Sequence, residues 1–302
     1  MPRSSPSDAA FRPDLLQPED VARLGGIEVT TEGVVAGFLA GLHRSARRGF
    51  SVEFAEHRPY QPGDEPRYID WKLLARTDRL YVKQFEEETS LRAMLVVDAS
   101  ASMGWRGAPD RLTKLDYAAR LAAALALVLV RQHDAVGLIT FDEQVRSMTP
   151  ARGTSAHWLT LARALAATEA GHATAAEPAL RQVVAALRRR GLVVFISDLL
   201  LDRPLALKAL RYLRHRGHQV LVLHIADPAE LELAPGGETR FLDPESSASV
   251  TLAPGEWTTA YRETVQQAVR DWRHACRAAG MRYALVSTDL PFGTALGQAL
   301  AR

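Results

Sequence analysis

The residues best suited to chemistry in this chain are a carboxylate and two hydroxyls that follow the apolar residues 94–97. They are Asp98, Ser100 and Ser102, in the pattern Asp-x-Ser-x-Ser. At the end of a buried strand these side chains can point into one small volume. Their oxygens are hard ligands, which suit a magnesium ion that keeps several of its waters. Because so few carboxylates cannot neutralise a divalent cation, a bound metal would attract an acidic group of a partner.

A second predicted strand end supplies another carboxylate. Asp198 follows the apolar residues 192–196 and Ser197. Because the carboxyl ends of parallel strands meet at one edge of a sheet, Asp198 is expected to complete the site directly or through water. The hydroxyl of Thr174 would be a further ligand, and Thr154 is the rival candidate. These residues predict a Mg²⁺ site, and Mn²⁺ or Ca²⁺ would suit the same ligands.

These residue types also allow other interpretations. Asp and Ser after a strand often cap helices or bind loop amides, which would leave a structural scaffold with a vestigial metal site. An enzymatic alternative is a haloacid-dehalogenase-like phosphatase in which Asp98 accepts a phosphoryl group. Such enzymes show the pattern Asp-x-Asp at this point, and the second aspartate is their general acid. Ser100 occupies that position here, and a serine cannot act as a general acid near neutral pH. We therefore predict a binding module that is not an enzyme.

The composition excludes several other classes of protein. Among 302 residues, 37 Lys and Arg against 35 Asp and Glu give a net charge of +2, which is too mild to predict nucleic-acid binding. The single cysteine, Cys276, excludes an intramolecular disulfide and a cysteine-based zinc site. Neither a secretory signal nor a long apolar stretch is evident, so we expect a cytoplasmic protein without a membrane span.

From residue 91 onward, apolar strands alternate with helices. The predicted strands lie at 94–97, 135–141, 192–197, 219–225 and 282–286, and the predicted helices at 112–132, 156–167, 177–190, 204–216, 256–279 and 291–301. Continuous apolar strands between helices predict an α/β fold with a doubly wound, mostly parallel sheet. Residues 1–18 are expected to be a disordered tail. Residues 19–90 are expected to form an N-terminal α+β extension ahead of the main domain at 91–302.

The extension contains a segment dense in arginine, aspartate and aromatic residues around a Pro-Gly-Asp turn. Five of its residues are candidates for partner binding: Arg58, Asp64, Arg67, Asp70 and Trp71. The two arginines are expected to pair with the two aspartates, with the tryptophan packed beneath. Such a network either fixes the extension to the main domain, as buried polar networks often do, or forms a docking surface for a partner.

The predicted metal ligands resemble the metal-ion-dependent adhesion site of von Willebrand factor type A domains. The matching positions are Asp98, Ser100, Ser102, Thr174 and Asp198. The resemblance implies that the serines and the threonine supply hydroxyls and that the aspartates bind directly or through water. It also implies that a carboxylate of a partner takes an open position on the metal.

The upstream segment resembles the bacterial family known as domain of unknown function 58. That family shows the pattern Arg-x-Tyr-x-x-Gly-Asp-x-x-Arg-x-Ile-Asp-Trp, which residues 58–71 match without a gap. Many members carry transmembrane helices before this region, so this chain resembles a soluble branch. Because the family's genes are often neighbours of MoxR-type AAA+ ATPases, the resemblance implies a partner or adaptor in the assembly or maturation of protein complexes.

Overall fold

The computed structural model describes residues 53–62, 64, 66, 69–86, 91–171, 176–232, 239–242, 249–252 and 257–301. The described residues before Ser90 form one unit, and those from Leu91 onward form another. The tail expected at residues 1–18 and the expected start of the extension at residue 19 lie outside the described residues.

The smaller unit consists of a strand pair and a short helix. Strand β1 (Glu53–Pro59) pairs antiparallel with β2 (Tyr81–Glu86), and helix α2 (Trp71–Thr77) lies between them in the chain. The helix begins after Asp70, whose carboxylate accepts hydrogen bonds from the backbone amides of Lys72 and Leu73 at 3.0 and 3.1 Å. This side chain satisfies amides that a helix start otherwise leaves without partners. The unit lies within residues 19–90, for which the sequence predicts an α+β extension.

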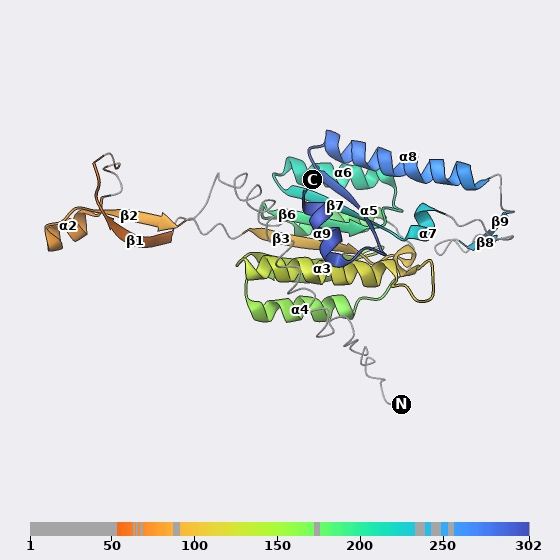
Figure 1. The fold of residues 1–302 in the computed structure, drawn as a ribbon, viewed down its shortest axis with the longest axis horizontal. Coiled ribbons are helices and arrows are strands. Elements are labelled where there is room, and N and C mark those ends of the chain that lie inside the picture. Colours follow the sequence, from red (N-terminus) through yellow and green to blue (C-terminus); the bar gives the residue numbers. More distant parts are fainter. Residues whose placement is uncertain are drawn as a thin grey trace, which may run out of the picture. The chain divides into compact units, whose positions relative to one another are not determined.

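The larger unit is built on a six-stranded sheet in the order β10-β7-β6-β3-β4-β5 (Figure 1). The strands are β3 (Arg92–Asp98), β4 (Ala135–Phe141), β5 (Val145–Arg152), β6 (Leu192–Ser197), β7 (Gln219–Ala226) and β10 (Arg282–Ser287). At one edge β5 runs antiparallel to β4, and the other neighbouring pairs are parallel. The predicted doubly wound, mostly parallel sheet is thus confirmed.

Helices cover both faces of this sheet. They are the 3-10 turn η3 (Ala101–Gly104), α3 (Lys114–Arg131), α4 (Ser155–Ala166), α5 (Ala176–Ala186), α6 (Arg203–His215), α7 (Pro228–Leu231), α8 (Trp257–Ala278) and α9 (Phe292–Ala301). A separate antiparallel pair is formed by β8 (Thr239–Leu242) and β9 (Ser249–Leu252). Helices α5, α6 and α8 lie on one face, and α3 and α4 on the other (Figure 1). Within the described ranges, no helix is long and apolar enough to cross a membrane.

Strand β3 shows how the core is divided between the two faces. Met94 and Val96 belong to the apolar cluster that also contains residues of α5, α6 and α8. Leu95 and Val97 alternate with them, face the side of α3 and are fully buried. Because both faces are covered, residues 93–97 in the interior of β3 are all apolar, which produces the continuous apolar run in the sequence.

The helix expected at residues 177–190 is shorter than expected, since α5 ends at Ala186. Gly191, just before β6, passes very close to β3. A β-carbon built on this glycine would lie 2.1 Å from the carbonyl oxygen of Arg92. The chain therefore has to leave the helix early enough for this glycine to reach the sheet.

Asp134, which lies between α3 and β4, carries a fully buried carboxyl group. One of its oxygens accepts a hydrogen bond from the amide of Leu91 at 2.7 Å, and the other has no partner among the described residues. Burial raises the pKa of Asp134 to about 7, although the Leu91 amide acts in the opposite direction. In the folded protein the protonated form is therefore favoured up to a pH of about 7.

The stabilising contribution of the Asp134 proton should be fully present below the ordinary pKa of 3.8 and should be lost as the pH rises through about 7. In Asp134→Asn no proton is exchanged at this position. Relative to the wild type, the free energy of unfolding of this variant should therefore increase with pH across that window, by at most about 1.4 kcal/mol per pH unit. Urea unfolding of both proteins at several pH values checks this, and parallel pH profiles would contradict it.

Candidate metal centre

The candidate site lies at the carboxyl ends of β3 and β6, which are neighbours in the sheet. Asp98 is the last residue of β3 and is fully buried. One of its carboxylate oxygens accepts a hydrogen bond from the amide of Ser100 at 2.9 Å. The other accepts a hydrogen bond from the hydroxyl of Ser197, the last residue of β6, at 2.6 Å. The two strand ends thus hold this carboxylate in one orientation.

The two serines of the Asp-x-Ser-x-Ser pattern lie side by side. Their hydroxyl oxygens are 3.1 Å apart. Ser100 is fully buried and Ser102 is 5% exposed. The turn η3 follows Ser100 directly and brings Ser102 back beside it. The structure therefore gathers the first three predicted ligands at one end of β3.

Asp198 lies at the same edge of the sheet, but a lysine holds it. Lys114 Nζ donates to Asp198 Oδ2 at 2.8 Å and to Glu230 Oε1 at 2.5 Å. The lysine side chain is only 1% exposed. The other oxygen of Asp198 accepts a hydrogen bond from the amide of Leu200 at 3.2 Å. Asp198 is thus close enough to influence the site, while one of its oxygens is engaged by the ammonium group.

Lys114 and Glu230 are not among the residues that the sequence predicts for the site. The lysine is 84 residues from Asp198 and 116 residues from Glu230 along the chain. A lysine at the start of an amphipathic helix ordinarily points to solvent, so its residue type gives no signal of this role. Glu230 has a weak local signal, because it forms a capping box with Asp227 at the start of α7.

The electrostatics of the site follow from burial and from the closeness of the carboxylates. Burial, and next the negative charge of Asp198, raises the pKa of Asp98 to about 7, while hydrogen bonds from Ser197 and Ser100 oppose the shift. Burial disfavours the Lys114 ammonium, but Asp198 and Glu230 together raise the pKa of Lys114 above its ordinary value. Lys114 pairs with Asp198 and Glu230, whereas only hydroxyl and amide donors contact Asp98 among the described residues, so its charge is not offset by a cation.

The donor set fits a hard divalent cation. In the described part of the chain, no group of three or more His, Cys, Asp or Glu side chains could hold a metal, so a site here needs hydroxyl ligands. Asp98, Ser100 and Ser102 supply one carboxylate and two hydroxyls, which suit a cation that keeps several waters. No cationic side chain of the described residues pairs with the buried Asp98 carboxylate. A cation would therefore relieve the cost of ionising it.

Thr154, one of the two threonine candidates, lies at the opposite end of the strands from the site. Arg152, two residues earlier, pairs with Val136 near the beginning of β4. Asp98 instead pairs with Phe141, the last residue of β4. The whole length of the strand therefore separates Thr154 from the site.

Thr174, the preferred threonine candidate, lies outside the described residues. Gly171 is the last described residue before Thr174, and its amide donates a hydrogen bond to the carbonyl of Ala99 at 2.7 Å. Ala99 lies between Asp98 and Ser100. The chain thus reaches the candidate site just before the segment that contains Thr174.

The residues of the upstream signature lie in the smaller unit. Arg58 Nη2 donates to Asp64 Oδ1 at 2.7 Å, as predicted, and this hydrogen bond holds the pKa of Asp64 below its ordinary value. Asp70 caps α2 and lies 2.9 Å from His57 Nε2. Arg67 lies outside the described residues, and so does its predicted pairing. The described part of the network therefore shapes the unit itself.

The prediction that Trp71 packs beneath this network is wrong, because its side chain is 61% exposed. Asp70 fixes the start of α2, so that Trp71 becomes the first helical residue. The buried position belongs instead to Ile69, which is 9% exposed and forms an isolated bridge to Val82 of β2. The smaller unit thus presents a large aromatic side chain on its surface.

This fold and site define an α/β chain with hydroxyl and carboxylate groups gathered at the carboxyl ends of its strands. The chain belongs to the family described as protein of unknown function DUF58, whose model matches residues 56–275. Uncharacterized proteins of Mycobacterium tuberculosis and Mycobacterium bovis are each 34% identical to it over 246 residues, which cover 78% of this chain and 74% of each relative. The family predicted from the sequence is thus confirmed, and the residues that the family model matches include Asp98 and Asp198.

Several solved structures are similar at low identity. BatB from Bacteroides thetaiotaomicron shows 17% identity and a TM-score of 0.46, over 70% of this chain and 97% of that one. An aerotolerance-related membrane protein from Bacteroides fragilis shows 18% identity and a TM-score of 0.47, over 70% of this chain and 98% of that one. The VWA domain of SpRpn10 shows 10% identity and a TM-score of 0.39, over 68% of this chain and 93% of that one. These likenesses are too distant to bear on a partner or a function.

Replacing Lys114 by methionine should strongly destabilise the larger unit, because Asp198 and Glu230 would remain without their ammonium partner. Breaking a buried ion pair from one side typically costs about 3–5 kcal/mol. The free energy of unfolding, measured with urea, should fall accordingly. Lys208→Met changes an exposed lysine of α6 and should have little effect. Similar losses in both variants would contradict a special role for Lys114.

Proposed function

We propose that this protein is a non-enzymatic, metal-dependent module that binds other proteins. In this proposal Mg²⁺ is held by Asp98, Ser100 and Ser102, and Asp198 and Thr174 complete the site directly or through water. A carboxylate of the partner would then occupy an open position on the metal. The observation that carries the proposal is the buried Asp98 carboxylate, which lies beside two hydroxyls without a cationic partner of its own among the described residues.

Binding suits this arrangement better than catalysis. Ser100 stands where a phosphatase of the alternative type would carry its general acid, and a serine hydroxyl does not serve as an acid near neutral pH. His224, on β7 near Asp198, is a poor substitute because burial lowers its pKa to about 4. Its Nδ1 is also engaged with the hydroxyl of Tyr283 at 2.7 Å. Neither group is suited to deliver a proton to a leaving group at neutral pH.

The surroundings of the site suit a protein partner. Trp105, just after η3, is 39% exposed, and Leu200, two residues after Asp198, is 61% exposed. Leu199 lies between Asp198 and Leu200 with φ of 58°, in the left-handed region, while its own side chain is buried. This local turn leaves the next leucine on the surface. Large apolar side chains around a charged centre are typical of protein interfaces.

We further propose that the partner is a MoxR-type AAA+ ATPase or one of its clients, and that the module acts in the cytoplasm in the assembly or maturation of protein complexes. The family resemblance of residues 58–71 supports this finer proposal. The exposed Trp71 supplies a second surface at which such a partner could bind. A single cysteine, which excludes an intramolecular disulfide, fits a reducing compartment.

Calorimetric titration with Mg²⁺ tests the metal site. The wild type should bind the ion saturably, and Asp98→Ala should lose this binding, because the variant lacks the carboxylate that binds the metal directly. Because the change also leaves the Ser100 amide and the Ser197 hydroxyl without this acceptor, circular dichroism is used to confirm that the variant is folded before titration. Glu263→Ala, which changes an exposed carboxylate of α8, is the matched control and should bind as the wild type does.

A partner assay separates the proposed function from its alternatives. A MoxR-type ATPase should be retained by the immobilised protein with Mg²⁺ and released by a chelator, and Asp98→Ala should not retain it. If the ATPase is retained equally after addition of the chelator and by Asp98→Ala, a scaffold with a vestigial metal site is favoured. Hydrolysis of a phosphate ester by the wild type, lost in Asp98→Ala, would favour the phosphatase alternative instead.

A further inference from the structure

The outer edge of β10 is open in the part of the chain that the structure describes. This strand is the last in the sheet order and pairs with β7 on its inner side. The amide of Thr288 donates to Ala226 at the end of β7, so the alternate residues Arg282, Ala284 and Val286 also direct their backbone groups inward. The amide and carbonyl groups of Tyr283 and Leu285 therefore point outward.

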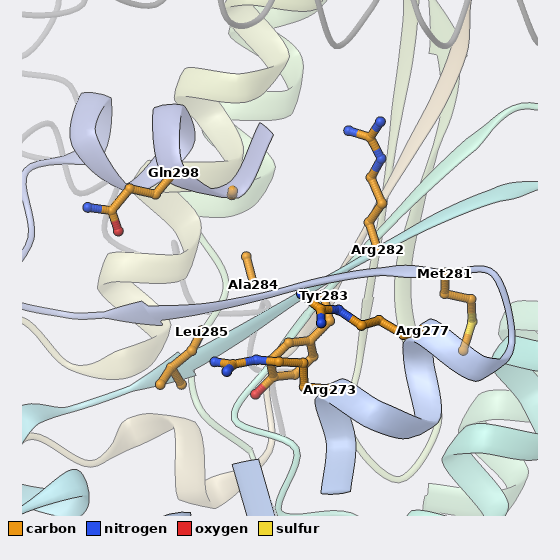
Figure 2. A pocket seen from close by; sticks show the side chains of 9 residues that line it. Arg273, Arg277, Met281, Arg282, Tyr283, Ala284, Leu285 and Gln298 are labelled. Carbon is orange, nitrogen blue, oxygen red and sulfur yellow. The ribbon is translucent and has the colours of Figure 1, made fainter. Parts of the chain in front are cut away.

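A cavity of about 130 Å³ lies along this edge. Residues 281–285 form its floor, α8 contributes Arg273 and Arg277, and α9 contributes Gln298 and Ala299. In Figure 2, Arg273 and Arg277 lie beside Tyr283, while Arg282 extends to the opposite side of the strand. The open edge is thus flanked by arginine side chains on both faces of the sheet.

The charge of two of these arginines is not compensated locally. No carboxylate of the described residues pairs with Arg273 or Arg277. The guanidinium carbon of Arg273 lies 5.9 Å from the ring centroid of Tyr283, which orients the side chain along the cavity. Arg282 donates to the carbonyl of Leu300 at 3.4 Å, and its side chain remains exposed. Arg273 and Arg277 therefore place positive charge next to the outward-directed backbone groups of Tyr283 and Leu285.

We infer that the β10 edge binds an extended acidic peptide segment of a partner protein, which adds to the sheet as a further strand. The backbone of the segment pairs with the outward groups of Tyr283 and Leu285. Successive side chains of a strand point to opposite faces, so acidic residues on one face meet Arg273 and Arg277. This site is separate from the metal centre and needs no metal.

The probe is a synthetic peptide of alternating glutamate and threonine with blocked termini, labelled for fluorescence anisotropy with the full chain. The glutamate peptide should bind, and a peptide with glutamine in place of glutamate should bind at least about tenfold more weakly. Added salt should weaken the first interaction because the ion pairs lie at the surface. On binding, hydrogen exchange at the amides of Tyr283 and Leu285 should slow.

Two variants locate the interaction on this edge. The double variant R273Q/R277Q should weaken binding at least about tenfold, whereas R188Q/R189Q, which removes the same charge from an exposed segment after α5, should leave it unchanged. Leu285→Pro removes an outward amide, and proline is tolerated on edge strands. This variant should abolish binding while its circular dichroism stays that of the wild type.

Three results would overturn the inference. The first is the absence of binding by the glutamate peptide. The second is an equal loss in both double arginine variants, which would show unspecific charge attraction. The third is self-association of the wild type that Leu285→Pro abolishes while peptide binding persists unchanged, which would assign the edge to a second copy of the chain.

Discussion

The ion pairs of Lys114 with Asp198 and Glu230 hold together the edge of the sheet that carries the candidate site. The lysine belongs to the first turn of α3, Asp198 follows β6, and Glu230 belongs to α7. Three elements that are distant in the chain therefore meet at one buried ammonium group. Its desolvation is costly, and two carboxylates are needed to offset it. The position of Asp198 relative to Asp98 is a consequence of this arrangement.

The same arrangement determines how much negative charge the site retains. Asp198 forms an ion pair with Lys114, whereas Asp98 accepts hydrogen bonds from the Ser100 amide and the Ser197 hydroxyl. Hydrogen bonds from neutral groups orient a carboxylate without cancelling its charge. The site thus combines an oriented carboxylate with uncharged oxygen ligands, which is the chemistry that favours a hard cation with bound water.

Local patterns in the sequence predicted most of the larger unit. Residues 192–197 are apolar throughout because both faces of β6 are covered, and this run was recognised as a strand. Asp98 and its two serines were recognised because a single turn brings them together. The end of α5 was misplaced, since the close approach of Gly191 to Arg92 depends on a strand a hundred residues earlier. Lys114 was missed for the same physical reason: its partners are brought to it by the fold and not by the local sequence.

The contact between Asp98 and Ser197 spans 99 residues of the chain. It forms once β3 and β6 have paired, which requires the closure of a long loop and makes this part of folding slow. A partly folded chain without this pairing has no complete site. A cation held there would consequently bind the native state in preference to unfolded chains, and its concentration would shift the folding equilibrium by mass action. Occupancy of the site would in that way report whether the central strands of the sheet have assembled.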